Sequence, residues 1–166
     1  KIGNNVIALA KTQGGLTELD DSIKKATGSN ATLIPFNLAS PETSFAILGQ
    51  TLFDRFGKID RLILNAATIG ASSPIAHTTE KDWQNVMDVN VTANMRLLRT
   101  LDPLLRSAGN PHITFITCRG LGDAYWGAYA ASKVALEQIA ASYAAETQQA
   151  GFNVDVFDPG IMATQL

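Results

Sequence analysis

Apolar residues along this chain fall into short continuous runs that alternate with longer segments of helical periodicity. Five runs rich in β-branched or aromatic residues predict strands at residues 6–10, 32–36, 62–64, 113–116 and 154–157. Each of the first four is followed by a helical pattern, at residues 16–25, 42–56, 81–105 and about 127–149. Thr79 is a candidate N-cap for the third helix.

The alternation of strand and helix predicts an α/β fold with a parallel sheet. The strands are nearly continuous apolar runs, which is typical of a sheet covered by helices on both faces. No linker, internal repeat or low-complexity tract divides the chain. We therefore expect a single domain over residues 1–166.

Composition narrows the classes of partner. Of 166 residues, 46% are hydrophobic and 17% charged, which is enough apolar material for a core. The net charge is −2 and the 13 basic residues are scattered, so we expect no nucleic-acid or anionic-membrane partner. No apolar run approaches the roughly 20 residues of a membrane span, and no signal peptide is recognised, which favours a soluble cytoplasmic protein.

Metal and disulfide chemistry is not indicated. Cys118 is the single cysteine, and His77 and His112 lie far apart in the sequence. These residues predict neither a disulfide framework nor a metal site.

Tyr129 and Lys133 are the most informative pair in the sequence. Three intervening residues place the phenol and the ammonium on one helix face. A nearby cation lowers the pKa of a phenol and eases proton exchange with a carbonyl or alcohol oxygen. Lys133 also shares its stripe with Leu136 and Ala140, which predicts a buried charge that needs a specific partner. The spacing also arises by chance, so its surroundings must decide.

Asn90 is a polar residue on the apolar stripe of the preceding helix. It is in register with Trp83, Val86, Ala93 and Leu97. An amide at such a position must be hydrogen-bonded. Both a satisfied core asparagine and a functional one fit this pattern.

Five motifs follow one another in a recognisable order. They are Leu64-Asn65-Ala66-Ala67 after a strand, Asn90 within a helix, Thr117-Cys118 at a strand end, Tyr129-x-x-x-Lys133, and Pro159-Gly160-x-x-x-Thr164. This order resembles the short-chain dehydrogenase/reductase family over essentially the whole chain. The resemblance implies a doubly wound parallel sheet of the Rossmann type.

The resemblance also implies a role for each matching residue. Tyr129 would be the general acid or base, and Lys133 would bias the phenol and hold the nicotinamide ribose. Asn90 would support a water that links the lysine to solvent. Cys118 falls where the family has a serine that orients the substrate oxygen. A thiol is the poorer hydrogen-bond donor, and the hydroxyl of Thr117 is the alternative.

The resemblance implies a dinucleotide site as well. Asn65, Ala66 and Ala67 would line the cofactor, and Pro159, Gly160 and Thr164 would close over it. Lys11 and Thr12 stand where an acidic residue would favour NAD, so we expect NADP, with NAD possible. The adenine would lie near Asn37 and Leu38.

One part of the family pattern is missing. Its first strand and glycine-rich loop are absent, and in the strand order 3-2-1-4-5-6 that strand is central. We expect its loss to split the sheet in two and to bare two apolar edges. The chain is therefore expected to be incomplete at its N-terminus and to continue beyond Leu166.

The sequence as a whole predicts an NADP-dependent oxidoreductase that acts on a small-molecule carbonyl or alcohol. Ala71 to Pro74, Tyr125 and Trp126 are candidates for the substrate pocket, which suggests a hydrophobic or ring-bearing substrate. A catalytically weak nucleotide-binding protein and a cofactor-retaining epimerase or dehydratase are the alternatives. Helices rich in small residues predict a homodimer or homotetramer.

Overall fold

The computed structural model describes residues 5–118 and 122–160 of the chain. The fold is α/β, and every pair of neighbouring strands is parallel. The chain forms two compact units, Lys1–Ser40 and Pro41–Leu166. The predicted fold class is confirmed, whereas the single domain stays a prediction.

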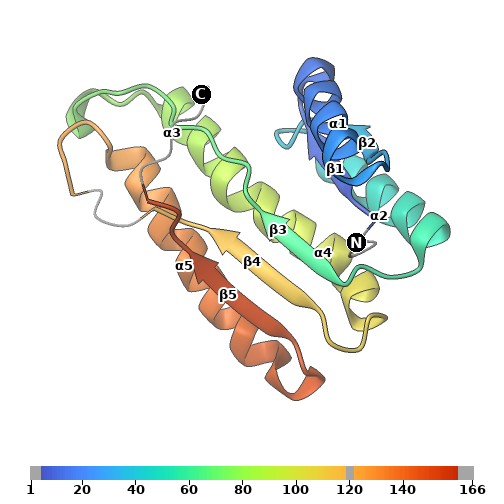
Figure 1. Ribbon diagram of the computed structural model, residues 1–166. Helices are drawn as coiled ribbons and strands as arrows, with labels where there is room; N and C mark the ends of the chain where they lie inside the picture. The colour runs from blue at the N-terminus through green and yellow to red at the C-terminus, as the bar shows by residue number, and fades with distance from the viewer. Residues whose placement is uncertain (1–4, 119–121, 161–166) are drawn as a thin grey trace. The chain divides into compact units, whose positions relative to one another are not determined.

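The first unit holds β1 (Ile7–Ala10), α1 (Gln13–Thr27) and β2 (Thr32–Pro35) (Figure 1). β1 and β2 pair with Ile7 opposite Thr32. α1 packs on both strands through Leu16, which is 1% exposed. The helix ends at Gly28, whose left-handed φ of 79° lets its N–H bond to the carbonyl of Lys24.

The second unit is built on a three-stranded sheet in the order β3-β4-β5. Its strands are β3 (Arg61–Leu64), β4 (His112–Ile116) and β5 (Asn153–Phe157). Its α-helices are α2 (Glu42–Phe56), α3 (Glu80–Met87), α4 (Ala93–Arg106) and α5 (Gly127–Thr147). Short helical turns are η1 (Ile75–His77), η2 (Asp88–Thr92) and η3 (Gln148–Ala150).

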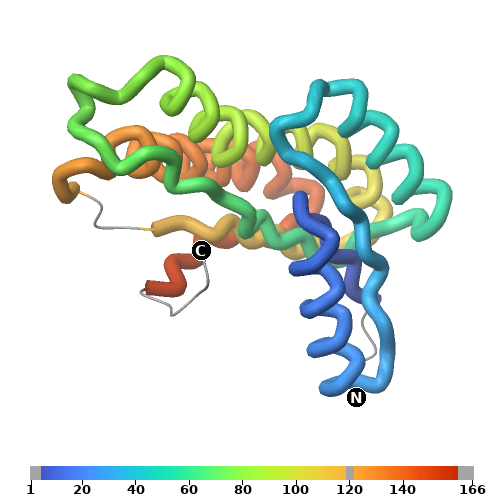
Figure 2. Tube along the Cα trace, turned by 90° about the horizontal axis from the view of Figure 1, so that it is seen from above, coloured from blue at the N-terminus to red at the C-terminus, as the bar shows by residue number. Residues whose placement is uncertain are grey.

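The helices of the second unit gather on one face of its sheet. Figures 1 and 2 show α4 and α5 running along β3, β4 and β5. Ile113 and Phe115 are fully buried beneath them. The alternate positions Ile63 and Phe157 are 64% and 54% exposed. The apolar strands predicted a sheet with helices on both faces. In this unit the helices cover only one face.

α3, η2 and α4 form one continuous helical segment, close to the predicted helix over residues 81–105. Thr79 caps it as predicted, because its hydroxyl oxygen accepts a hydrogen bond from the N–H of Asp82 (3.1 Å). The segment contains a π-helical turn at Asp88–Thr92, which no sequence pattern indicated. Such turns are frequent at functional sites.

The two separate sheets, β1-β2 and β3-β4-β5, match the split expected of the strand order 3-2-1-4-5-6 without its first strand. Among the helices in the described ranges, none is both long and apolar enough to cross a membrane. The predicted helix and strand boundaries agree with the structure to within a few residues.

Candidate active site

Three strand ends of the second unit point to the same edge of its sheet. Asn65 follows β3, Cys118 follows soon after β4, and Asp158 follows β5. Since these strands are parallel, their carboxyl ends meet at one edge. That edge is where α/β sheets bind ligands.

Lys133 lies beneath this edge, inside the protein. Its side chain is buried, with the residue only 3% exposed, on the stripe that also buries Leu136 and Ala140. Its Nζ donates a hydrogen bond to the carbonyl oxygen of Ile116 (2.9 Å) and lies 5.5 Å from the ring centroid of Tyr129. The predicted need for a specific partner is therefore met by a backbone carbonyl at the end of β4.

The electrostatics of this pair differ from the expectation. Burial raises the pKa of Tyr129, and charges on Cys118 and Asp158 raise it further. Burial lowers the pKa of Lys133, while Cys118 acts in the opposite direction. The expected lowering of the Tyr129 pKa by Lys133 was wrong for the chain without ligands. The ammonium is directed at the Ile116 carbonyl and the face of the ring, so desolvation dominates.

Asn90 sits in the π turn and is 1% exposed. Its amide oxygen accepts from the N–H of Thr68 (2.8 Å), and its amide nitrogen donates to the Thr68 carbonyl (2.9 Å) and to Ser132 Oγ (2.9 Å). Ser132 in turn donates to the carbonyl oxygen of Tyr129 (2.7 Å). The predicted hydrogen bonding of Asn90 is confirmed, and it joins the loop after β3 to the helix that carries Tyr129.

The carbonyl of Asn90 has a partner of its own. The Asn94 side chain, which is 2% exposed, donates its Nδ2 to that oxygen at 2.7 Å. Val86, Ala93 and Leu97 are buried around this segment as predicted. Trp83 is 37% exposed, so its place on the buried stripe was wrong. Trp83 lies in the first turn of α3, where the helix surface is still open to solvent, whereas Val86 in the next turn is buried.

Thr117 and Cys118 have different surroundings. Thr117 is 2% exposed, and its hydroxyl donates to Glu137 Oε1 of α5 (2.7 Å). Its N–H also bonds to the carbonyl oxygen of Phe157 (2.9 Å). Cys118 is half-buried and acts electrostatically on both Tyr129 and Lys133. Two residues are candidates for the serine position, and the hydroxyl of Thr117 is already bonded to Glu137. Cys118 is therefore the better candidate, since it acts electrostatically on both Tyr129 and Lys133.

The start of α5 is flanked by aromatic residues. Trp126 and Tyr129 contact at a centroid distance of 5.8 Å. Tyr125 is 57% exposed and has a φ of 77°, a left-handed conformation that is rare for a bulky residue. A Cβ on Gly127 would lie 2.8 Å from Ile75 Cδ1, so a side chain there would displace η1. These contacts bring the loop that holds residues 71–74 toward the helix of Tyr129.

The residues expected to line the cofactor in this unit have short side chains at an open surface. Asn65, Ala66 and Ala67 are exposed after β3. Gly160 has a φ of 69°, and no atom lies within 4 Å of where a Cβ would stand. Pro159 is half-buried beside it. Thr164 lies outside the described residues.

The residues expected to contact the cofactor in the first unit lie at the strand ends. Lys11 and Thr12 are exposed between β1 and α1, and the Thr12 side chain makes no capping hydrogen bond. Asn37 Oδ1 already accepts a hydrogen bond from the N–H of Ala39 (3.1 Å). Leu38 is 9% exposed, so any contact it makes to a ligand is through its backbone.

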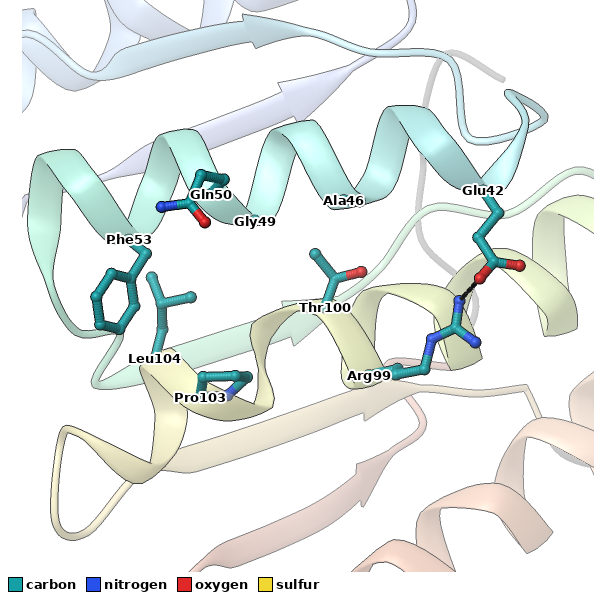
Figure 3. Close-up of a pocket in the computed structure, with 9 residues that line it drawn as sticks. All are labelled: Glu42, Ala46, Gly49, Gln50, Phe53, Arg99, Thr100, Pro103 and Leu104. Carbon is teal, nitrogen blue, oxygen red and sulfur yellow. Dashed lines mark hydrogen bonds and ion pairs between the residues drawn. The ribbon is translucent and has the colours of Figure 1, made fainter.

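A pocket of about 530 Å³ lies elsewhere, between α2 and α4 (Figure 3). Its floor is a close helix approach, where a Cβ on Gly49 would lie 2.5 Å from Thr100 Cγ2. Among the lining residues drawn in Figure 3, one ion pair is present, between Glu42 and Arg99. None of the predicted catalytic residues lines this pocket. Its surface offers no nucleophile paired with a base, so it is not a candidate active site.

Metal chemistry finds no support in the described ranges, where no three His, Cys, Asp or Glu residues are grouped to hold an ion. Sequence reasoning missed three residues around the site: Ser132, which donates to the Tyr129 carbonyl; Asp158, which raises the pKa of Tyr129; and Glu137, which accepts from Thr117. The one available signal for Glu137 was its position four residues after Lys133 on the same helix face.

Comparison with known proteins gives consistent results. The sequence model of the short chain dehydrogenase family matches residues 1–166. The uncharacterized oxidoreductase YciK of Escherichia coli (strain K12) is 31% identical over 163 residues, covering 96% of this chain and 64% of its own. The NADPH-dependent pterin aldehyde reductase of Arabidopsis thaliana is 30% identical over 168 residues, covering 100% of this chain and 68% of its own.

Solved structures are similar as well. The short chain dehydrogenase of Escherichia coli CFT073 in complex with NADPH has a TM-score of 0.89 at 30% identity. The match covers 95% of this chain and 67% of that one. The chain thus spans about two thirds of the length of each of these three proteins.

Proposed function

Because this chain belongs to the short-chain dehydrogenase/reductase family, we propose that it takes part in hydride transfer between NADP(H) and a small-molecule carbonyl or alcohol. The observation that carries the proposal is the burial of Lys133, 3% exposed, against the ring of Tyr129. A buried ammonium is costly, so its retention beside a phenol favours a chemical role. The chain covers 64% of YciK and 68% of the pterin aldehyde reductase, so the activity of the whole protein is a proposal.

Tyr129 moves the proton in the proposed reaction. In reduction its Oη donates a proton to the substrate oxygen, and in oxidation the phenolate accepts one from the alcohol. Burial raises the pKa of Tyr129 in the chain described here, so its phenol is protonated but is a weaker acid than a free tyrosine. Bound nicotinamide supplies or accepts the hydride. Lys133 holds its ammonium within reach of the same ring.

Asn90 holds the geometry of this site. Two of its hydrogen bonds hold the π turn to Thr68 in the loop after β3. The third, to Ser132, holds the π turn to α5, the helix of Tyr129 and Lys133. Its role in holding a water between Lys133 and solvent is part of the proposal. The Asn90 carbonyl already accepts a hydrogen bond from Asn94 Nδ2, so a water bound there would share that oxygen with the Asn94 amide.

Cys118 takes the position of the substrate-orienting hydrogen-bond donor in this proposal. The support is that Thr117, the alternative, gives its hydroxyl to Glu137 and is buried. A thiol donates a weaker hydrogen bond than a hydroxyl. We therefore expect modest turnover that a serine at this position would improve.

The chemistry of the two strand ends fits the cofactor. Short side chains and open space after β3 and β5 fit a flat nicotinamide, with Asn65, Ala66, Ala67, Pro159 and Gly160 around it. Lys11 and the uncapped Thr12 at the start of α1 fit the extra phosphate of NADP. The NADPH complex of the similar Escherichia coli CFT073 protein supports the same choice.

Replacement of Tyr129 by phenylalanine tests the proposed function. General acid or base catalysis contributes about 10² to 10⁴ in rate, so Tyr129→Phe should lose that factor in kcat and keep NADPH affinity. Tyr143→Phe is the matched control on the same helix, since it removes one hydroxyl bonded to Asp102 (2.9 Å). Unchanged kcat in Tyr129→Phe would contradict the role of the phenol. NADPH binding with little or no turnover in the wild type would favour the alternative, a nucleotide-binding protein with little catalysis.

We also propose that the protein forms a homodimer or homotetramer through α4 and α5. Met95 on α4 is 42% exposed and Val134 on α5 is 68% exposed. Apolar side chains exposed on long helices suit an isologous helix contact. A monomeric mass in size-exclusion chromatography with light scattering would contradict this assignment.

A further inference from the structure

We propose that Asn94 is a positioning residue for Tyr129. Its side-chain amide anchors the carbonyl of Asn90 in the π turn, and Asn90 passes this constraint to the start of α5 through Ser132. The catalytic consequence rests on the proposed function. The hydrogen bonds themselves lie within the second unit.

The first bond joins Asn94 Nδ2 to the carbonyl oxygen of Asn90 at 2.7 Å. Asn94 is 2% exposed and Asn90 is 1% exposed, so water has little access to either partner. Loss of one partner from a buried hydrogen bond costs more than loss of one from an exposed bond, because water does not replace it. The first turn of α4 therefore fixes the carbonyl of Asn90.

The constraint acts on the irregular part of the helical segment. In the π turn the N–H of Ala93 bonds to the carbonyl oxygen of Asp88, five residues earlier instead of the four of an α-helix. A π turn is a rare conformation. The Asn94 side chain adds a bond that the regular backbone pattern does not contain, and this bond stabilises the turn in its present form.

Two further bonds carry the constraint to Tyr129. Asn90 Nδ2 donates to Ser132 Oγ at 2.9 Å, and Ser132 Oγ donates to the carbonyl oxygen of Tyr129 at 2.7 Å. Ser132 is 0% exposed, so this link is shielded from water as well. The three bonds form a series from α4 through the π turn to the residue that is proposed to move the proton. Misplacement of a reacting group by about 1 Å can cost on the order of 10² in rate, so such a series affects catalysis.

The chain itself indicates how to remove the donor and nothing else. On α5 the buried Thr147 donates its hydroxyl to the carbonyl oxygen of Tyr143, four residues earlier, at 2.6 Å. Asn94→Thr supplies a hydroxyl that can reach the Asn90 carbonyl in the same way. Asn94→Val has nearly the same shape as Asn94→Thr but no donor. The two variants therefore differ in the hydrogen bond under test.

Amide hydrogen exchange of the native full-length protein, without cofactor or substrate, measures the effect on the turn. The N–H of Thr68 bonds to Asn90 Oδ1 at 2.8 Å, so its exchange rate reports whether Asn90 is held. The rate should be about fivefold or more higher in Asn94→Val than in Asn94→Thr. Equal rates in these two variants would overturn the inference, and so would a Thr68 amide without protection in the wild type.

Thr147→Val is the matched control. It removes a buried hydroxyl that bonds to a carbonyl four residues earlier, at the far end of α5 from Tyr129. Both the exchange rate of the Thr68 N–H and the turnover should stay within about twofold of the wild type, because this bond is outside the series. An equal effect of Thr147→Val and Asn94→Val would mean general loss of stability and would overturn the inference.

Turnover provides a readout that a purely structural role would not move. The kcat of Asn94→Val should be about fivefold or more below that of Asn94→Thr, while the KM for NADPH stays within about twofold. The double variant Asn94→Val/Ser132→Ala should lose no more kcat than the more damaging single variant, because the bonds act in series. A higher kcat in Asn94→Val would mean that Asn94 competes with the proposed water for the Asn90 carbonyl, which contradicts positioning.

The two proposals fail in different ways, because hydrogen exchange needs neither substrate nor NADPH. Absence of turnover in the wild type, with the exchange pattern as expected, would contradict the proposed function alone. If Asn94→Val lacks a cooperative thermal melt, Asn94→Ser and Asn94→Ala give the same comparison of a donor with its absence.

Discussion

Asn90 Nδ2 in the π turn donates a hydrogen bond of 2.9 Å to Ser132 Oγ on α5, and both residues are essentially inaccessible to solvent. The bond joins two long helical segments at the level of Tyr129, because Ser132 also donates to the Tyr129 carbonyl. The helix with the proposed catalytic pair is thereby held to the loop after β3, which contributes Thr68.

Loss of the Ser132 hydroxyl should therefore destabilise the second unit. Ser132→Ala leaves a buried amide hydrogen without this acceptor, at a cost of about 1–3 kcal/mol. Urea denaturation measures the change in the free energy of unfolding. Ser22→Ala is the control, because that exposed hydroxyl bonds only to the Glu18 carbonyl (2.9 Å), and it should shift stability by less than about 0.5 kcal/mol.

Replacement of Cys118 should change turnover in opposite directions according to the substitute. Cys118→Ser supplies a better hydrogen-bond donor near Tyr129, so kcat for carbonyl reduction should rise about fivefold. Cys118→Ala removes the donor, so kcat should fall. Steady-state kinetics at saturating NADPH measures both. Equal rates in the two variants would contradict a hydrogen-bonding role for this side chain.

Asp158 should tune the pH dependence through Tyr129. Its carboxylate disfavours the phenolate and raises the pKa of Tyr129, so Asp158→Asn should lower that pKa. Oxidation uses the phenolate and should gain rate at lower pH in the variant, while the alkaline fall of reduction should begin earlier. Asparagine can still accept the hydrogen bond from the Gly160 N–H (2.9 Å). pH profiles of kcat/KM in both directions measure the shift.

A control for this change is Asp155→Asn, which removes a carboxylate within β5, three residues before Asp158, at its pairing with His112. Its pH profile for turnover should match that of the wild type. An identical shift in both variants would mean that net charge, and not the specific effect of Asp158 on the pKa of Tyr129, sets the profile.

Lys11 should decide between the two nicotinamide cofactors. A ligand that binds only the native state raises stability by RT ln(1 + [L]/Kd), so thermal melts with NADPH and NADH compare the affinities. We expect a larger shift with NADPH, and Lys11→Glu should weaken NADPH at least tenfold while sparing NADH. Lys25→Glu in the last turn of α1 makes the same charge change away from the strand end and should preserve the NADPH shift.

Local patterns in the sequence were enough to predict the secondary structure and the identity of the central pair. The four main helical segments and five strands follow from hydrophobic periodicity, because burial of one face imposes a repeat of 3.6 or 2 residues on the chain. The i to i+4 spacing put Tyr129 and Lys133 on one face for the same reason.

Tertiary packing alone decided how those residues are used. The π turn at Asn90, the commitment of Thr117 to Glu137 and the raised pKa of Tyr129 depend on neighbours that lie about 10 to 40 residues away in the sequence. No pattern along the chain records the direction of a side chain or the desolvation of its charge. Those properties arise only when α5 is packed against β4 and the π turn.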